Sequence, residues 1–260
     1  MINNFPLVSV IMPAYNAEQF VREAINSVIS QTLTDWELLV IDDCSTDDTQ
    51  RIVAEFAEKD SRIQLLVNEV NMGVAKTRNR GLALCRGQYV ALLDSDDYYK
   101  PDMLQKMVDC AKRTKADIVY CSYELVDEQG KKVCNDFIVP EQTDFEHSLV
   151  RSVITCSSVL MTCELAKNNR FPTGLYHEDI ALWFQLLRDG VKACGVTEIL
   201  AAYRQRSSSK SANKVKSAIR RWNVYRKHLK LPIYKSLGYI VGYAYYGIIK
   251  YERVAVSRRK

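Results

Sequence analysis

The sequence predicts an α/β fold in which helices flank a mostly parallel sheet. Two observations lead to this prediction. Segments with strand and helix character alternate along the first hundred residues, and the strand-like segments are apolar at nearly every position. A strand without polar alternation is buried on both faces, which is usual for a parallel strand covered by helices on both sides. At 260 residues the chain has room for one such domain with an appendage.

The first half of the chain supplies the alternating elements. Short apolar segments rich in β-branched residues predict four strands, at residues 8–13, 37–43, 63–68 and 89–94. Helical spacing and capping residues predict helices at 17–31, from a cap at Ser45 or Thr46 to about residue 59, and at 74–85. Pro101 suits the first turn of a fourth helix.

The regular alternation stops after residues 116–123. A hairpin is expected around Gly130, a further strand within 153–162, and a helix that opens near Glu178. A last strand is expected near residues 194–203, ahead of a basic C-terminal region.

The net charge of +5 conceals an asymmetry between the two ends of the chain. Residues 203–260 hold 16 Lys and Arg and a single acid, Glu252, whereas the first 202 residues hold 20 basic and 30 acidic residues. An acidic body with a basic tail indicates that the tail meets an anionic partner, whether phosphate groups, nucleic acid or a lipid surface.

The eight cysteines indicate a reducing compartment. None forms a C-x-x-C pair or has a histidine at metal-ligand spacing, and most lie in apolar runs. Buried reduced thiols in a cytosolic protein are therefore expected, and the N-terminal residues lack the pattern of a signal peptide.

Polar side chains stand at the carboxyl ends of the predicted strands, where parallel sheets bind their ligands. These ends comprise the segment from Pro13 to Asn16, the pair Asp42 and Asp43, Asn68, and Asp94 with Asp96. Carboxylates spaced as Asp94 and Asp96 can hold a hard divalent cation, which is most useful against a diphosphate. Taken alone, the same acids are equally well explained as caps of turns and of the next helix.

Four motifs in a fixed order resemble those of the family 2 glycosyltransferases. They are PAYN (13–16), VIDDCSTDDT (40–49), NMGVAKTRNRGL (71–82) and LLDSDDYYKPD (92–102). The similarity extends over about residues 6–205. It implies a catalytic domain at 1–205 with the Rossmann-like GT-A fold, followed by a basic, aromatic helical region at 206–260. It also implies a nucleotide-sugar donor, Mn²⁺ or Mg²⁺ as cofactor, and transfer with inversion.

The resemblance implies a nucleotide site at the ends of the first two strands. Pro13, Ala14 and Tyr15 match the turn whose backbone and aromatic ring hold the nucleobase. Asp43 matches the acid that accepts the imide N–H of the base, and Asp42 is the less favoured choice. The ordinary alternatives are a loop aromatic for Tyr15 and a helix N-cap for Asp43.

The fourth motif implies contacts with the ribose, the diphosphate and the metal. Asp94 is expected near the ribose, with Ser95 as a further donor-binding residue. Asp96 is expected to bind the metal under the diphosphate, and Asp97 to support it from behind.

Several basic residues match positions near the donor. Arg78 matches a helix arginine near the base and the diphosphate, whereas Lys76 and Arg80 fall off its face and are expected in solvent. Arg204 and Arg206, in YRQRSSSKS (203–211), match a loop that clamps the diphosphate. Many family members have a histidine in this loop and this chain has none, which leaves open the residue that completes the phosphate side. A solvated basic loop is an equal alternative.

A second pair of acids matches the family's proton acceptor. In a single displacement, a general base takes the proton of the acceptor hydroxyl as it attacks the anomeric carbon. Asp179 is expected to be this base and Glu178 to bind the acceptor. Acids in a first helical turn otherwise only complement the helix dipole, and His177 is the less favoured candidate for a metal ligand.

The tail at 227–254 is basic, aromatic and apolar. Between Lys235 and Lys250 lie 14 uncharged residues, fewer than the roughly 20 apolar residues of a spanning helix. Peripheral contact with an anionic membrane through residues 231–254 is expected, at the cytoplasmic, inner face of the plasma membrane. The alternative is a helix pair that packs on the domain or on a second subunit, as in a homodimer. No recognisable module supports binding of nucleic acid.

The function expected from the motifs is hexosyl transfer from a nucleotide-sugar, best matched by a UDP-sugar, to a saccharide or lipid-linked acceptor in polysaccharide or glycolipid assembly. Three other classes compete. A haloacid-dehalogenase-type phosphatase has its Asp-x-Asp after the first strand, and a nucleotidyltransferase has a Gly-rich, Arg-containing loop there, where this chain has PAYNAEQF. A non-catalytic basic-tailed binding module leaves the Asp clusters unexplained.

Overall fold

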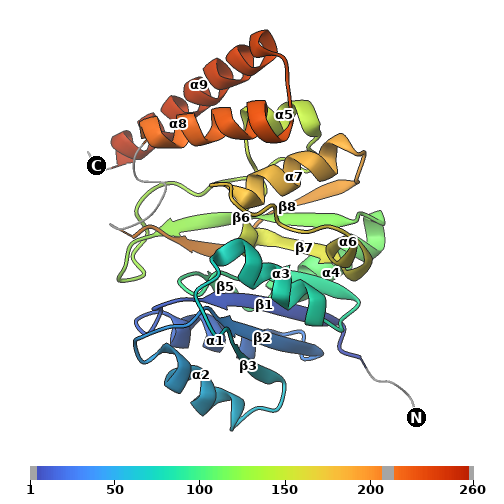
Figure 1. Ribbon diagram of the computed structural model, residues 1–260, viewed down its shortest axis with the longest axis vertical. Coiled ribbons are helices and arrows are strands. Elements are labelled where there is room, and N and C mark those ends of the chain that lie inside the picture. The colour runs from blue at the N-terminus through green and yellow to red at the C-terminus, as the bar shows by residue number, and fades with distance from the viewer. Residues whose placement is uncertain (1–4, 207–213, 258–260) are drawn as a thin grey trace.

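The computed structural model describes residues 5–206 and 214–257, with side chains described as far as Arg206 and from Ser217 to Tyr246. Among these residues, eight strands form one sheet in the order β3-β2-β1-β4-β7-β6-β8-β5 (Figure 1). The strands are β1 (Val8–Ala14), β2 (Trp36–Asp42), β3 (Ile63–Val67), β4 (Tyr89–Leu92), β5 (Tyr98–Tyr99), β6 (Ile118–Val126), β7 (Val159–Thr162) and β8 (Ala193–Arg204). β1 pairs in parallel with β2 and β4, and β2 with β3, which confirms the predicted parallel sheet.

Helices cover both faces of this sheet, and the last two helices lie beyond its upper end (Figure 1). The described helices are α1 (Val21–Ile29), α2 (Thr49–Ala57), α3 (Val74–Leu84), α4 (Met103–Thr114), α5 (Phe145–Val150), α6 (Cys163–Asn168), α7 (Glu178–Arg188), α8 (Lys214–Asn223) and α9 (Ile233–Ser257). A short 3-10 helix lies at Cys156–Ser158, and a π-helical segment at Val224–His228 follows α8. α1 begins four residues later than predicted from the pattern at 17–31.

The side chains of β1 alternate between two hydrophobic clusters, one on each face of the sheet. Val10 and Met12 belong to the cluster that α1 and α4 complete, whereas Ile11 belongs to the cluster that contains residues of α3 and α7. All three are fully buried, and complete burial of such a side chain contributes about 1.5–3 kcal/mol. The strand is apolar at successive positions because each face meets a hydrophobic core.

The start of α2 differs from the prediction, and the reason lies in the loops beside the sheet. The helix begins at Thr49, after Asp48, so the expected cap at Ser45 or Thr46 is wrong. Ser45 Oγ instead accepts a hydrogen bond from the N–H of Asn16 (2.9 Å), and the N–H of Thr46 donates to Asn16 Oδ1 (2.9 Å). These polar groups join the loops after β1 and β2, at the edge of the sheet where ligands bind.

The second half of the chain follows the prediction less closely. The hairpin around Gly130, the helix from Glu178 and the last strand are confirmed. Within 153–162, however, the strand is limited to β7, and β5, α5 and α6 were not predicted. β5 has two residues, and α5 and α6 have six each, which is too short for a hydrophobic period to reveal.

The C-terminal helices pack against the body of the protein at the upper end of Figure 1. Val224, Tyr225 and Leu229 form a buried cluster with Leu149 of α5 and Phe184 of α7. The rings of Phe184 and Tyr225 are stacked, with centroids 6.1 Å apart. We refer to α8, the π-helical segment and α9 together as the C-terminal hairpin; it supports the helix that begins with Glu178.

Candidate active site

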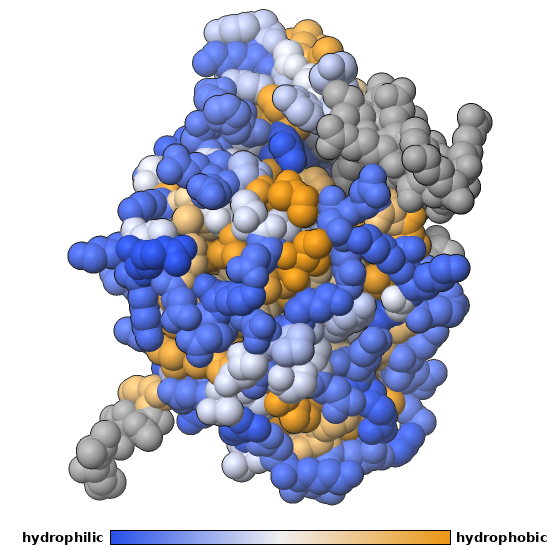
Figure 2. All heavy atoms as spheres, turned by 180° about the vertical axis from the view of Figure 1, so that it is seen from behind, coloured by the Kyte–Doolittle hydropathy of each residue, from blue (hydrophilic) through white to orange (hydrophobic). Residues whose placement is uncertain are grey.

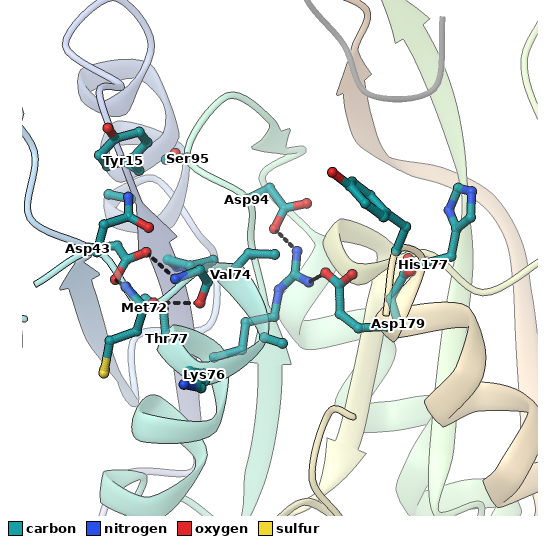
Figure 3. A pocket seen from close by; sticks show the side chains of 18 of the residues that line it. Tyr15, Asp43, Met72, Val74, Lys76, Thr77, Asp94, Ser95, His177 and Asp179 are labelled. Atoms are coloured by element: carbon teal, nitrogen blue, oxygen red, sulfur yellow. Dashed lines mark hydrogen bonds and ion pairs between the residues drawn. The ribbon is translucent and has the colours of Figure 1, made fainter. Parts of the chain in front are cut away.

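A cavity of about 1150 Å³ opens at the carboxyl ends of β1, β2 and β4. All twelve residues predicted for the site line it, namely Pro13, Ala14, Tyr15, Asp43, Arg78, Asp94, Ser95, Asp96, Glu178, Asp179, Arg204 and Arg206. Figure 3 shows Tyr15 and Asp43 on one side of the cavity, His177 and Asp179 on the other, and Asp94 between them. The acids that lie far apart in the sequence therefore meet at one edge of the sheet, as predicted.

The loop before α3 holds Asp43 in place. Its Oδ1 accepts hydrogen bonds from the N–H of Met72 and the side-chain amide of Asn68, and its Oδ2 accepts one from the N–H of Gly73, all at 2.8 Å (Figure 3). Gly73 has φ +82°, a conformation that favours glycine. Burial by itself raises the pKa of Asp43, but these hydrogen bonds together lower it by more. The net shift is downward, and the carboxylate stays ionised.

The neighbours of Asp43 separate its role from that of Asp42. Asp42 Oδ2 accepts hydrogen bonds from the N–H of Ser45 (2.9 Å) and the side chain of Gln50 (2.8 Å), and it does not line the cavity. The structure therefore places Asp43, the favoured of the two, at the cavity. Tyr15 lies at the same side, and half of its surface is exposed.

Arg78 joins the two sides of the cavity. Its guanidinium donates to Asp94 Oδ1 (2.6 Å) and to Glu178 Oε1 (3.0 Å), although Glu178 lies 100 residues away in the sequence. The side chain is almost fully buried and lies over the ring of Phe171. Burial disfavours its charge, but Asp94, Cys156 and Glu178 together raise the pKa of Arg78, and it remains a cation. Among the described residues, the hydrogen bonds of the Arg78 guanidinium are thus with protein carboxylates.

The loop after β4 rests on a buried acid. Asp97 accepts hydrogen bonds from the hydroxyl of Ser157 (2.5 Å) and from the N–H of Arg204 (2.8 Å), while Ser157 Oγ accepts one from the N–H of Asp94 (3.1 Å). Burial, followed by the charges of Asp96 and Asp94, raises the pKa of Asp97 well above its usual value. Asp97 does not line the cavity, which agrees with the supporting role expected for it.

Asp96 presents its carboxylate to the cavity beside Arg206, whose Nη1 lies 3.4 Å from Oδ2. Burial and then the charge of Asp94 raise the pKa of Asp96, and Arg206 lowers it. Among the described residues, no group of three or more His, Cys, Asp or Glu side chains is arranged to hold a metal ion. A single carboxylate at a cavity fits Mg²⁺ or Mn²⁺ only in sites where substrate phosphates supply further oxygen ligands.

Arg204 and Arg206 differ in their surroundings, although the sequence groups them. The guanidinium of Arg204 is buried; it donates to the carbonyl oxygens of Asp96, Asp127 and Glu128 and forms an ion pair with Glu23. Arg206 is about one-third exposed at the cavity. Arg204 therefore holds the loop that carries Asp96, and Arg206 is the better placed of the two to meet a phosphate.

The first turn of α7 presents two acids with different partners. Glu178 is paired with Arg78, whereas Asp179 accepts no hydrogen bond from another side chain among the described residues. Burial raises the pKa of both carboxyl groups, and Arg78 opposes the rise. His177, which precedes the helix with φ +66°, has a pKa lowered to about 4 by burial and then by Arg221 and Arg220. A neutral imidazole can bind a metal, but the two arginine charges near His177 repel a cation, so this position disfavours a metal ion.

Sequence patterns missed or misplaced several residues around the cavity. Tyr176 and Arg220 line it, and no local motif indicates this, because Arg220 reaches it from the C-terminal hairpin. Lys76 is exposed as expected, yet it stands at the cavity wall. Arg80 is not simply solvated, since its Nη1 donates to the carbonyl oxygen of Val67 at the end of β3.

Comparison with known proteins gives consistent matches. The model of the family described as "Glycosyl transferase family 2" matches residues 9–133. TuaG of Bacillus subtilis, which is named as a glycosyltransferase of teichuronic acid biosynthesis, is 36% identical over 94% of this chain and 97% of its own length. WfgD of Escherichia coli, named as a UDP-Glc:α-D-GlcNAc-diphosphoundecaprenol β-1,3-glucosyltransferase, is 36% identical over 90% of this chain and 92% of its own.

Solved structures show the same fold at lower identity. A crystal structure of Staphylococcus aureus TarS 1–349 in complex with UDP-GlcNAc superposes with a TM-score of 0.71 at 22% identity, over 91% of this chain and 71% of that one. The mannosyltransferase PcManGT of Pyrobaculum calidifontis, solved with GDP-Man and Mn²⁺, superposes with a TM-score of 0.64 at 21% identity, over 86% of this chain and 63% of that one. These similarities confirm the predicted fold.

Proposed function

Because this chain belongs to glycosyltransferase family 2, and is therefore an enzyme with the GT-A fold, we propose that it transfers a hexose from a UDP-sugar to a hydroxyl of a saccharide acceptor with inversion. The observation that carries this proposal is the meeting of Asp43, Asp96 and Asp179 at one cavity. Three acids at separate places in one cavity can then serve the nucleobase, the diphosphate and the acceptor hydroxyl of one reaction.

The nucleobase is proposed to bind between Tyr15 and Asp43. The exposed ring of Tyr15 offers a stacking face, and Pro13 and Ala14 form the floor at the end of β1. Hydrogen bonds from Met72, Gly73 and Asn68 fix the orientation of the Asp43 carboxylate at the cavity. This carboxylate suits the imide N–H of uracil, and its lowered pKa keeps it an acceptor.

The diphosphate is proposed to lie over Asp94, Ser95 and Asp96, with Arg206 beside it. Asp96 would hold Mn²⁺ or Mg²⁺ together with the phosphate oxygens, and such an ion neutralises the charge of the leaving nucleotide when it is bound. Arg204 keeps the loop at the required position through the carbonyl oxygen of Asp96. Arg204 thus supports the site from outside the cavity, and Arg206 is proposed to face the donor.

Asp179 is proposed to accept the proton of the attacking hydroxyl. In an inverting displacement, the hydroxyl attacks from the face opposite the nucleotide, and Figure 3 shows Asp179 across the cavity from Asp43. Its pKa is raised by burial, which brings a carboxylate closer to the pKa of an effective base. Glu178, held by Arg78, is proposed to orient the acceptor.

The simplest test of this proposal is isothermal titration with UDP in the presence of Mn²⁺. Binding that disappears on addition of EDTA supports a metal-dependent transferase, and a screen of nucleotide-sugars for slow hydrolysis then identifies the donor. Absence of binding to UDP and to the other nucleoside diphosphates would contradict the proposal. A phosphatase would instead hydrolyse phosphate monoesters, which the same preparation can be assayed for.

The C-terminal hairpin is proposed to contact an anionic membrane at the inner face of the plasma membrane, where a lipid-linked acceptor would be reached. Ile233, Leu237, Val241 and Tyr245 recur every four residues along α9, and each exposes more than half of its surface. Hydrophobic side chains also surface at the upper end of the molecule in Figure 2, where Figure 1 places the hairpin. Residues 217–246 contain six Lys and Arg and no acid, which suits anionic headgroups.

This contact is testable with point substitutions on the exposed face. Within the described parts of the chain, no helix has the length and apolar character needed to span a bilayer. Leu237→Asp combined with Val241→Asp should reduce binding to phosphatidylglycerol vesicles at least ~10-fold, because two apolar groups of about 1.5 kcal/mol or more are lost from the interface. Ile138→Asp, at an exposed site outside the hairpin, is the control. Unchanged vesicle binding, or a dimer that the double substitution dissociates, would contradict membrane contact.

A further inference from the structure

The C-terminal hairpin contributes a cation to the acceptor side of the cavity. Arg220 of α8 lines the same cavity as Glu178 and Asp179. Its guanidinium lies over the ring of Tyr176, 4.2 Å from the centroid, and Tyr176 lies two residues before the start of α7. An arginine stacked in this way uses its face for the aromatic ring, while its N–H groups lie in the plane and are suited to a phosphate.

A second arginine adds positive charge to this side. Arg221 is buried, its Nη2 donates to Ser152 Oγ (2.7 Å), and it lies over the rings of Phe184 and Tyr243. Among the described residues, its Nε and Nη1 have no hydrogen-bond partner and Arg221 forms no ion pair. The pKa of His177 is lowered by burial and by the positive charges of these two arginines.

The donor leaves this positive region unexplained. The donor diphosphate is assigned to Asp96 and Arg206, and the nucleobase to Tyr15 and Asp43 on the opposite side of the cavity (Figure 3). A neutral sugar acceptor needs hydrogen-bonding groups and stacking surfaces, and gains little from two guanidinium groups. An acceptor that carries its own phosphate explains both of them.

We infer that Tyr176 and Arg220 form a subsite for a phosphate or diphosphate attached to the acceptor sugar, with the buried charge of Arg221 behind it. The inference rests on the proposed function and names the class of its acceptor. With the reacting hydroxyl at Asp179, the anomeric substituent of the acceptor lies across one sugar ring, towards the hairpin. The C-terminal hairpin would then carry both the phosphate subsite, through Arg220 of α8, and the proposed membrane face, on α9.

The test measures binding of geranyl diphosphate to the full chain with UDP and Mn²⁺ at saturation, so that the donor phosphate positions are filled. The wild-type protein should bind it at one site. Arg220→Gln should weaken this binding about 10–100-fold, because a charge-assisted contact is lost, and Arg220→Lys should weaken it less. Lys227→Gln, an exposed residue of the same hairpin, removes an equal charge away from the cavity and should leave binding unchanged.

Three outcomes would overturn the inference. The first is no saturable binding of geranyl diphosphate by a wild-type protein that binds UDP. The second is equal binding by the wild type and by an Arg220→Gln variant with an unchanged melting temperature. The third is loss of UDP binding in that variant, which would assign Arg220 to the donor.

A vesicle arm separates the two sources of phosphate. If Arg220→Gln weakens binding to phosphatidylglycerol vesicles more than Lys227→Gln does, and leaves geranyl diphosphate binding intact, Arg220 meets lipid headgroups and the subsite is wrong. If the wild-type protein binds no nucleotide, the proposed function fails independently of this subsite.

Discussion

The two sides of the cavity are built by different means. On the side proposed for the donor, called the donor side below, hydrogen bonds from adjoining loops hold the carboxylates at the strand ends, as Met72 and Gly73 hold Asp43. On the side proposed for the acceptor, called the acceptor side, packing positions the helix that presents Asp179, since Phe184 of this helix stacks on Tyr225 of the hairpin. The donor side therefore depends on polar groups near the sheet, and the acceptor side on a hydrophobic contact with the distant C-terminal hairpin.

Arg78 connects the two sides of the cavity. Its buried guanidinium contacts Asp94 on one side and Glu178 on the other. A buried cation with two anionic partners is costly to disrupt, because the remaining charges stay desolvated. We therefore predict that substitutions on the donor side change UDP affinity, whereas substitutions on the acceptor side change turnover or stability. Only a substitution of Arg78 is expected to change both.

The sharpest separation is expected from Asp179→Asn. We predict that kcat falls about 10²–10⁴-fold, because the amide cannot accept the proton, while UDP affinity in Mn²⁺ stays within twofold. Titration and initial rates on the purified protein measure both. Near wild-type transfer would refute the base assignment and make Glu178 the candidate.

The pH profile of the wild type sharpens the same assignment. The base must be ionised, so kcat/KM should rise as pH increases through the pKa of Asp179. Because burial raises that pKa, the acidic limb should lie above the pH expected of an exposed aspartate. An acidic limb at the ordinary aspartate pKa, or none, would argue against Asp179.

The packing side of the comparison is tested by Phe184→Ala. The side chain is almost fully buried between α7 and the hairpin, and we expect the free energy of unfolding to fall by about 3–5 kcal/mol. Chemical denaturation measures this loss. If the two sides are independent, UDP affinity of the folded variant should be preserved, and a parallel loss of donor affinity would break the distinction.

Asp96→Asn tests the donor side. The variant should weaken UDP binding in Mn²⁺ about 100-fold, equivalent to about 2.7 kcal/mol, because the carboxylate proposed to hold the metal is lost. In EDTA, where the wild type is expected to lose UDP binding, the variant should not differ from it. Asp102→Asn, on the exposed start of α4, is the control and should behave like the wild type. The decisive result would be an Asp96 variant whose UDP affinity no longer depends on Mn²⁺, whereas that of the wild type does. A variant that keeps the full Mn²⁺ dependence would show that another group holds the metal.

A smaller effect is expected from Arg204→Lys. Lysine cannot reproduce the contacts of the guanidinium with three carbonyl oxygens and Glu23. We expect the donor KM to rise about 10-fold, with kcat less affected, because the loop that carries Asp96 loosens. Arg22→Lys, in an exposed ion pair with Glu55, should change neither constant. A kcat loss equal to that of Asp179→Asn would mean that Arg204 acts in the chemical step.

Much of the donor side was predictable because its signals are local. An apolar run followed by Asp42 and Asp43, or by Asp94 and Asp96, is sufficient to place these acids at the end of a parallel strand. Strand order then brings such ends together, since Ala14 of β1 lies beside Asp42 of β2 and Ile11 of β1 beside Leu92 of β4. The family motifs assigned the roles that remain proposals here.

The sequence by itself determined the alternating elements, the buried sheet and the acids at its edge, because these follow from periodicity and from residues a few positions apart. Only the tertiary structure decided which partners each charge meets. Arg78 reaches Glu178 across 100 residues, Arg204 turns inward to the carbonyl oxygen of Asp96 across 108, and the hairpin brings Arg220 to the cavity. Such contacts depend on how helices pack on the sheet, and packing of residues that are distant in the chain leaves no periodic signal in the sequence.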